Sequence, residues 1–178
     1  MMKTYAGIGS RETPIVICDT MYEVAGMLRL ENFWLNSGGA PGADTAFERG
    51  CADPSRMNIF LPWKYFNGST LPFVQPSRDL EQKAFELAAK HHPGWEYLKQ
   101  GPRKLMARNG YQILGPNLDE EEKVRFVLCW TPDGCESTKT RSRKTGGTGQ
   151  AISIADAYGV PVINMFNPHW EERLKEHL

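Results

Sequence analysis

The sequence predicts an α/β fold, a single Rossmann-like, doubly wound and mainly parallel sheet with helices on both faces. Short apolar runs typical of buried strands alternate along the chain with amphipathic segments of helical period. Glycine-rich turns separate several of these segments, and right-handed crossovers between parallel strands place helices on both sides of a sheet. The length of 178 residues corresponds to about one domain. Residues 1–178 are therefore expected to form one unit.

Three strands and two helices are predicted in the first part of the chain. Each strand is a short apolar run that ends at turn residues; the strands are residues 5–8, 33–35 and 58–61. Thr13 is expected to cap the first helix, because Pro14 suits the first helical position. The two helices are residues 14–28, whose apolar side chains share one broad face, and residues 41–51.

A long loop rich in proline and aromatic residues is predicted at about residues 63–77. Loops of this length without secondary structure are commonly functional lids or flexible segments. The aromatic side chains of the loop are Trp63, Tyr65, Phe66 and Phe73. They fit two roles, stacking on a bound base or packing within the protein and across a dimer contact.

The remaining elements continue the alternation of helices and strands. Helices are predicted at residues 80–91, 102–113 and 150–158, with a short charged surface helix after residue 167. The apolar, β-rich run at 124–130 predicts a central strand buried on both faces, and 159–164 is the last strand. The segment between residues 131 and 149 is rich in glycine and basic residues, which indicates a loop.

Composition excludes several classes of protein. Forty per cent of the residues are hydrophobic and 24% are charged, which are ordinary globular values. The 21 Lys and Arg residues balance 21 Asp and Glu residues, and residues 119–122 are a compact acidic run. This balance argues against a broadly basic nucleic-acid binder. The four cysteines form no CxxC pair, so we expect free thiols in a reducing cytoplasm, no metal and no cofactor. No apolar run is long enough for a signal peptide or a membrane span.

Three glycine-rich turns predict a phosphate-bearing ligand. They are residues 7–11 (GIGSR), 37–44 (SGGAPGAD) and 145–150 (TGGTGQ), and the last two run into predicted helices. Glycine lets a ligand approach the backbone, and the N–H groups at a helix start attract anions. Ligands of doubly wound sheets lie beyond the carboxyl ends of the strands, where these turns fall. None of the turns is a Walker A loop, and GxGxxG fails because Glu12 occupies its last position.

These three motifs together resemble the SLOG superfamily, whose members share a Rossmann-like nucleotide-binding fold with the Lonely Guy phosphoribohydrolases and DNA-processing protein A. The segment RNGYQ at 108–112 is similar to that of phage and bacterial members of unknown role. The resemblance spans roughly residues 5 to 165, interrupted by the 63–77 loop. Its motifs are specific for the fold and poorly specific for any reaction.

The resemblance implies a nucleotide held by the glycine turns. The implied binding residues are Gly7, Gly9, Ser10, Arg11, Ser37, Gly38, Gly39, Gly42, Asp44, Gly146, Gly147, Thr148, Gly149 and Gln150. Asp44 fits either a ribose-hydroxyl acceptor or a carboxylate that favours its helix start. Gln150 fits either a reader of a base edge or a helix-start residue. Arg141 and Arg143, in a basic run, fit a solvated surface, an anion clamp or a nucleic-acid contact.

The expected function is binding of a nucleotide or nucleotide-derived small molecule, for sensing or sequestration, with a signalling derivative of ADP-ribose or a cyclic nucleotide as examples. The alternative is a nucleoside-phosphate N-glycosidase. Lonely Guy enzymes carry a glutamate shortly after the third glycine motif, whereas no carboxylate follows here until Asp156. Asp44 and Glu48 are then the candidate catalytic carboxylates. A single-stranded DNA-handling role is less favoured because the net charge is zero, and the resemblance suggests a homodimer.

Overall fold

The computed structural model describes residues 2–178 and contains a five-stranded sheet. All strand pairs are parallel, and the order across the sheet is β3-β2-β1-β4-β5. The strands are β1 (Lys3–Gly7), β2 (Phe33–Ser37), β3 (Met57–Ile59), β4 (Val127–Cys129) and β5 (Val162–Asn164). The predicted Rossmann-like α/β class is confirmed. Because the chain reverses its direction of growth between β3 and β4, the carboxyl ends of β1 and β4 flank the switch point where such folds bind ligands.

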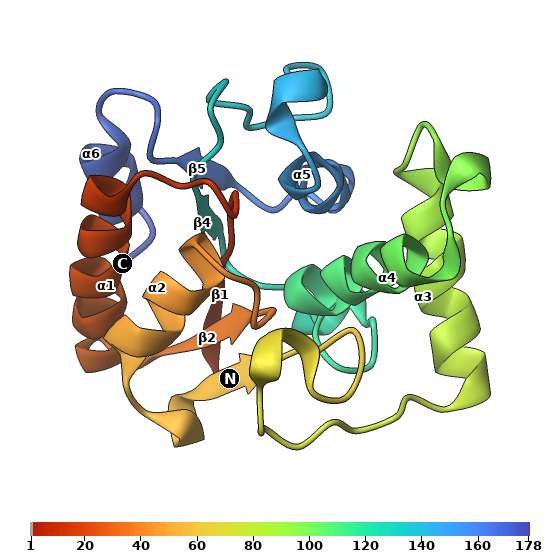
Figure 1. Cartoon of the computed structure of the whole chain (residues 1–178). Coiled ribbons are helices and arrows are strands. Elements are labelled where there is room, and N and C mark those ends of the chain that lie inside the picture. Colours follow the sequence, from red (N-terminus) through yellow and green to blue (C-terminus); the bar gives the residue numbers. More distant parts are fainter. Residues whose placement is uncertain (1) are drawn as a thin grey trace.

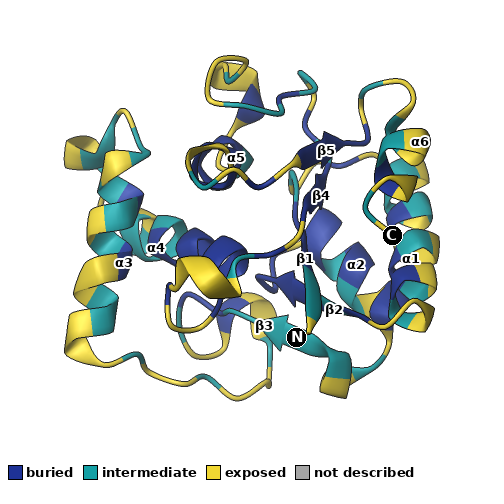
Figure 2. Cartoon of the chain, turned by 180° about the vertical axis from the view of Figure 1, so that it is seen from behind, coloured by how far each residue is buried: buried dark blue, intermediate teal, exposed yellow. Residues whose placement is uncertain are grey.

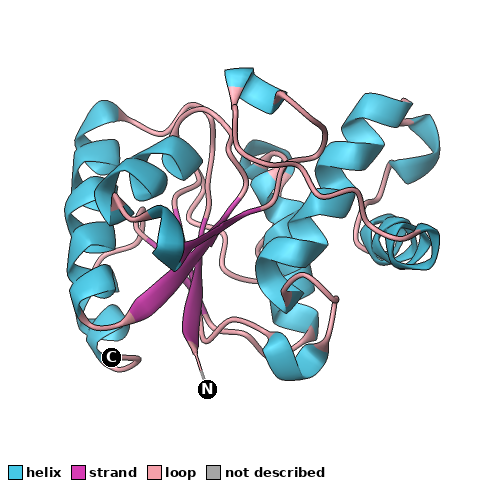
Figure 3. Ribbon diagram, turned by 90° about the horizontal axis from the view of Figure 1, so that it is seen from below, coloured by secondary structure: helices cyan, strands magenta, loops and turns pink. Residues whose placement is uncertain are grey.

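Helices cover both faces of the sheet (Figure 1, Figure 3). One face packs against α1 (Ile15–Leu30), α2 (Ala43–Cys51) and α6 (Trp170–Lys175). The other face packs against α4 (Gln100–Leu114) and α5 (Thr148–Ala157). Helix α3 (Arg78–Lys90) lies on the outside of α4, and intermediate and exposed residues run along most of its length (Figure 2).

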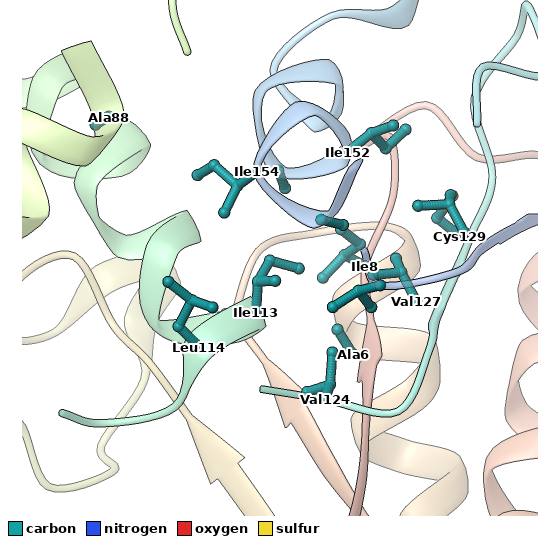
Figure 4. Close-up of a cluster of buried hydrophobic side chains, with 14 of the residues drawn as sticks. Ala6, Ile8, Ala88, Ile113, Leu114, Val124, Val127, Cys129, Ile152 and Ile154 are labelled. Carbon is teal, nitrogen blue, oxygen red and sulfur yellow. The ribbon is translucent and has the colours of Figure 1, made fainter. Parts of the chain in front are cut away.

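Alternate side chains of the strands fill two separate cores, as expected for strands buried on both faces. Tyr5 and Phe126 stack between the sheet and α1 with ring centroids 5.7 Å apart. On the opposite face, Ile113 of α4 and Ile152 of α5 gather around Ile8 at the end of β1 (Figure 4). The second of these cores holds α4 and α5 against the sheet near the carboxyl ends of its strands.

A close approach of two backbones sets the packing of α1 on α2. A Cβ added at Gly50 would lie 2.7 Å from both the Cα and the carbonyl carbon of Tyr22 in α1. Because real Cβ atoms do not come that close to backbone, glycine is required at this crossing. The crossing in turn orients α2, whose amino-terminal end carries Asp44 to the edge of the sheet.

Three strands, β3, β4 and β5, are shorter than the sequence predicted, and the first helix is capped differently. The N–H of Val124 donates to the carbonyl of Ile113 in α4 and not to the sheet, and the paired residues of β4 begin at Val127. Pro161 has no N–H, and β5 begins after it. Pro14, not Thr13, is the N-cap of α1, because the Thr13 hydroxyl donates to the carbonyl of Ser10 instead.

The 63–77 loop contains a short 3-10 turn, Phe66–Gly68, and no other helix or strand before α3. Phe66 is buried against Ala40 and Leu61, with Trp63 and Phe73 packed at the edge of the same small cluster. Three of its four aromatic side chains therefore pack within the protein, while Tyr65 is 64% exposed.

Candidate functional site

A cavity of about 340 Å³ lies at the carboxyl edge of the sheet. Its walls combine the turn after β1, the start of α2, the middle of α4 and the turn before α5. This volume falls within the range of small-molecule sites, roughly 300 to 1,000 Å³. Sequence patterns placed the site at this edge, and the structure contains a cavity of suitable size there.

Seven of the predicted binding residues line the cavity, namely Gly9, Ser10, Arg11, Asp44, Gly146, Gly147 and Thr148. Ten other predicted residues lie outside its lining, namely Gly7, Ser37, Gly38, Gly39, Gly42, Glu48, Arg141, Arg143, Gly149 and Gln150. Residues of the first and third glycine turns thus line the cavity, whereas the second turn contributes only Ala40 and Asp44 and its three glycines lie outside the lining.

Gln150 and Arg141 are held by other parts of the protein. Gln150 is fully buried; its Nε2 donates to the carbonyl of Ala88 and its Oε1 accepts from Asn109 at 2.9 Å. Arg141 donates from Nη1 to the carbonyl of His91 at 2.8 Å and to the hydroxyl of Ser153 at 3.2 Å. Both side chains therefore connect α5 and its preceding loop to the α3–α4 layer.

The second glycine turn is occupied by carboxylates of its own helix. The N–H of Gly39 donates to Oε1 of Glu48 at 2.9 Å, and the N–H of Ala40 donates to Oδ2 of Asp44 at 3.3 Å. A phosphate at this turn would have to displace one of these side chains. The turn instead fixes Asp44, so that its carboxyl group faces the cavity.

Burial makes both carboxyl groups weaker acids. Desolvation raises the pKa of Asp44 to about 6, against the opposing effects of Arg108 and the N–H groups of Ala40 and Gly38. Desolvation and then the charge of Asp44 raise the pKa of Glu48 to about 7. Near neutral pH both carboxyl groups can therefore gain or lose a proton when their surroundings change slightly.

The third turn presents free backbone donors. Among residues 2–178, no hydrogen-bond acceptor is found for the N–H groups of Gly147 and Thr148, which begin α5. Gly146 has a φ of 67°, the left-handed conformation that glycine adopts without strain. Lys144 lines the same wall. The start of α5 and a lysine side chain therefore give this wall a positive potential.

Arg108 of α4 is a site residue that the sequence patterns did not assign. The side chain is only 8% exposed yet lines the cavity. Its Nη1 donates to the carbonyls of Gly38 and Phe60, and its Nε donates to Oδ1 of Asn109. Within the described chain, Nη2 has no acceptor and the guanidinium forms no ion pair within 4.0 Å.

Gly38 makes room for this arginine, because a Cβ there would overlap the Nη1 atom. Arg108 and Gln112 are one helical turn apart and both line the cavity among apolar residues. The sequence did contain a signal for this part of the site, because Arg108 and Gln112 are polar residues four positions apart on the buried face of a helix.

Two further properties bear on the kind of site. Within residues 2–178, no cluster of three or more His, Cys, Asp or Glu side chains is arranged to hold a metal ion. None of the helices described has the length and hydrophobicity to cross a membrane.

The sheet order and the helices on both faces define a Rossmann-like α/β protein with a cavity at the switch point of its sheet. No protein-family model matches the sequence, and a search of curated proteins finds no match. Among solved structures, the chain is similar to DNA processing protein A from Helicobacter pylori, described for its single-stranded DNA binding mode. The TM-score is 0.54 and the identity 18%, over 98% of this chain and 72% of the other. At this identity the two proteins share a fold.

Proposed function

We propose that the cavity binds a nucleotide or a nucleotide-derived small anion. The observation that carries the proposal is Arg108, a guanidinium that is nine-tenths buried, lines the cavity and lacks a paired carboxylate. Desolvation lowers the pKa of Arg108, and the charges of Asp44 and Glu48, beyond ion-pair distance, only partly offset it. An anionic ligand in direct contact would stabilise this buried charge. Charge-assisted hydrogen bonds from arginine to phosphate are among the stronger polar contacts in proteins.

The rest of the cavity wall fits the parts of a nucleotide. Arg11, Lys144 and the N–H groups at the start of α5 give the cavity wall positive potential, which suits phosphate. Ile8 and Met106 give an apolar surface of the kind that contacts a base. The carboxyl group of Asp44 can accept hydrogen bonds from sugar hydroxyls.

The proposal is tested by mass spectrometry on the protein after incubation with nucleoside monophosphates, NAD, ADP-ribose and cyclic nucleotides. We expect one of these compounds to be retained intact. The Arg108→Met variant should bind it at least about tenfold more weakly, because a charged hydrogen bond contributes about 1.5–3 kcal/mol. Arg49→Met is the matched control, since Arg49 is exposed on α2 and lies outside the cavity lining. Equal retention by both variants would refute the role of Arg108.

A second candidate function, N-glycosidic bond hydrolysis, is favoured by one observation. Asp44 lines the cavity, and its pKa, raised to about 6, lies near the operating pH of a general acid or base. For this function we expect free base and ribose phosphate in the filtrate of the same experiment. Asp44→Asn should then remove turnover while the intact nucleotide still binds. Base release that survives this substitution would eliminate Asp44 as the catalytic group.

A further inference from the structure

We propose that Asp133 is a positioning residue for this site, holding the segment 142–148 so that Lys144 and the free N–H groups face the cavity. Asp133 lies in the turn after β4. Its neighbour Pro132 lines the cavity, whereas Asp133 itself does not. The proposal rests on the proposed function, because it explains how the anion-binding wall is built.

The carboxylate of Asp133 receives hydrogen bonds from two different parts of the chain. Oδ1 accepts from the Thr131 hydroxyl at 2.9 Å and from the N–H of Cys135 at 3.3 Å, both in its own turn. Oδ2 accepts from the hydroxyls of Ser142, at 2.7 Å, and Thr145. One carboxylate thus joins the end of β4 to the segment that precedes α5.

The turn that carries Asp133 is itself anchored to the sheet. Asn164, the last residue of β5, donates from Nδ2 to the Thr131 hydroxyl at 2.6 Å and to the carbonyl of Cys135 at 2.9 Å. Its Oδ1 accepts from the N–H of Thr131. All three residues are fully buried, so Asp133 is attached to a rigid part of the fold.

On the other side of the carboxylate lies the wall of the cavity. Ser142 caps the short 3-10 turn Arg143–Thr145, and Thr145 is its last residue. The two residues also bond to each other, with the Ser142 N–H donating to Thr145 Oγ1 at 2.9 Å. Lys144 and Thr145 both line the cavity, followed by Gly146 and the start of α5. Lys144 and Gly146 are exposed, so packing contributes little to their position.

Asp133 receives these bonds without a cation to neutralise it. No lysine, arginine or histidine of the described chain forms an ion pair with it. Hydrogen bonds from Thr145, Ser142, Thr131 and Cys135 outweigh desolvation and lower the pKa of its carboxyl group. The ionised carboxylate can accept all four bonds, whereas an asparagine amide would have to replace two acceptor positions with donors.

The experiment compares Asp133→Asn with wild type by hydrogen–deuterium exchange on the ligand-free protein. We expect the amides of residues 144–149 to exchange at least about tenfold faster in the variant, with the amides of β1 unchanged. Asp53→Asn is the matched control. Asp53 also accepts hydrogen bonds from a serine: the N–H of Ser55 donates to it at 3.0 Å and the Ser55 hydroxyl at 2.7 Å. Asp53, however, precedes the amino end of β3, away from the carboxyl edge of the sheet. This control should leave segment 144–149 unaffected.

Ser142→Ala tests whether Asp133 acts through the segment. If it does, the double variant Asp133→Asn/Ser142→Ala should exchange no faster than the more strongly affected single variant, because both changes break the same contact. Binding of AMP, used as the probe, should weaken about tenfold in Asp133→Asn and stay unchanged in Asp53→Asn.

Two results would overturn the proposal. In the first, segment 144–149 of Asp133→Asn keeps its wild-type exchange rate. In the second, all amides, including those of β1, exchange faster together, which would mean that Asp133 supports global stability only. If wild type retains no nucleotide of the panel, the proposed function fails separately, and the exchange data still decide whether Asp133 orders the segment.

Discussion

Glu48 shows how a single side chain can report on the environment of the site. Its carboxyl group is largely removed from water and receives a hydrogen bond from the N–H of Gly39 at 2.9 Å, and Ser37 also acts to lower its pKa. The pKa nevertheless rises from its usual 4.5 to about 7, so desolvation and the neighbouring charge of Asp44 dominate. The folded protein therefore holds a proton on Glu48 over a pH range in which the unfolded chain has lost it.

This difference predicts how stability depends on pH. Between about pH 4.5 and 7 the folded state binds more protons than the unfolded state, so the free energy of unfolding falls as pH rises. Glu48→Gln should remove this contribution, on the order of 2 kcal/mol after allowing for partial exposure. Urea unfolding at pH 4.5, 6 and 8 measures it, and parallel pH curves for wild type and variant would show that Glu48 titrates normally.

At the scale of elements, the crossing of α1 and α2 gives a second prediction. Gly50→Ala should lower the free energy of unfolding by about 1–3 kcal/mol, because the added Cβ overlaps the backbone of Tyr22. Gly101→Ala is the control: Gly101 lies in α4 with nothing within 4 Å of an added Cβ, and alanine there should stabilise by up to about 1 kcal/mol. Urea unfolding compares the two, and equal effects would show that the close α1–α2 contact is not required.

The elements also show what the sequence could predict. The sequence patterns identified the five strands and six α-helices of the described chain, because strands buried on both faces and amphipathic helices have distinct patterns, but they did not identify the short 3-10 helices. It placed the boundaries of β4 less well, since the N–H of Val124 bonds to α4, a contact between residues distant in sequence. Arg108 was missed for the same reason: its role depends on Gly38 and Phe60, which only the folded chain brings next to it.

The glycine motifs were informative about place and less so about contacts. All three turns lie at the carboxyl edge, as the alternation of strands and helices predicted. The sequence could not show that Asp44 and Glu48 bond back to the second turn. An acidic residue near the start of a helix is also expected simply because the helix N-terminus attracts negative charge. Carboxylates of α2 thus take up backbone N–H groups of the second turn, whereas the N–H groups of Gly147 and Thr148 at the third turn have no acceptor in the described chain.

At the scale of the whole molecule, charge distribution separates a small ligand from a long one. The chain has no net charge, and the cationic side chains that line the cavity are Arg11, Arg108 and Lys144. The structurally similar Helicobacter pylori protein is described as binding single-stranded DNA. If this chain does so through the cavity alone, it can neutralise about three phosphates, one for each of these side chains.

This number fixes the expected salt dependence of DNA binding. For single strands the logarithm of the association constant falls with the logarithm of salt concentration by about 0.7 per neutralised phosphate, so three contacts give a slope of about −2. Fluorescence anisotropy with a labelled oligothymidine between 50 and 200 mM salt should therefore show at most an approximately twentyfold loss of affinity. A much steeper slope would require basic side chains beyond the cavity, and would favour an extended nucleic-acid surface over a small-molecule site. A slope of about −2 or shallower that Arg108→Met reduces further would assign the contact to the cavity itself.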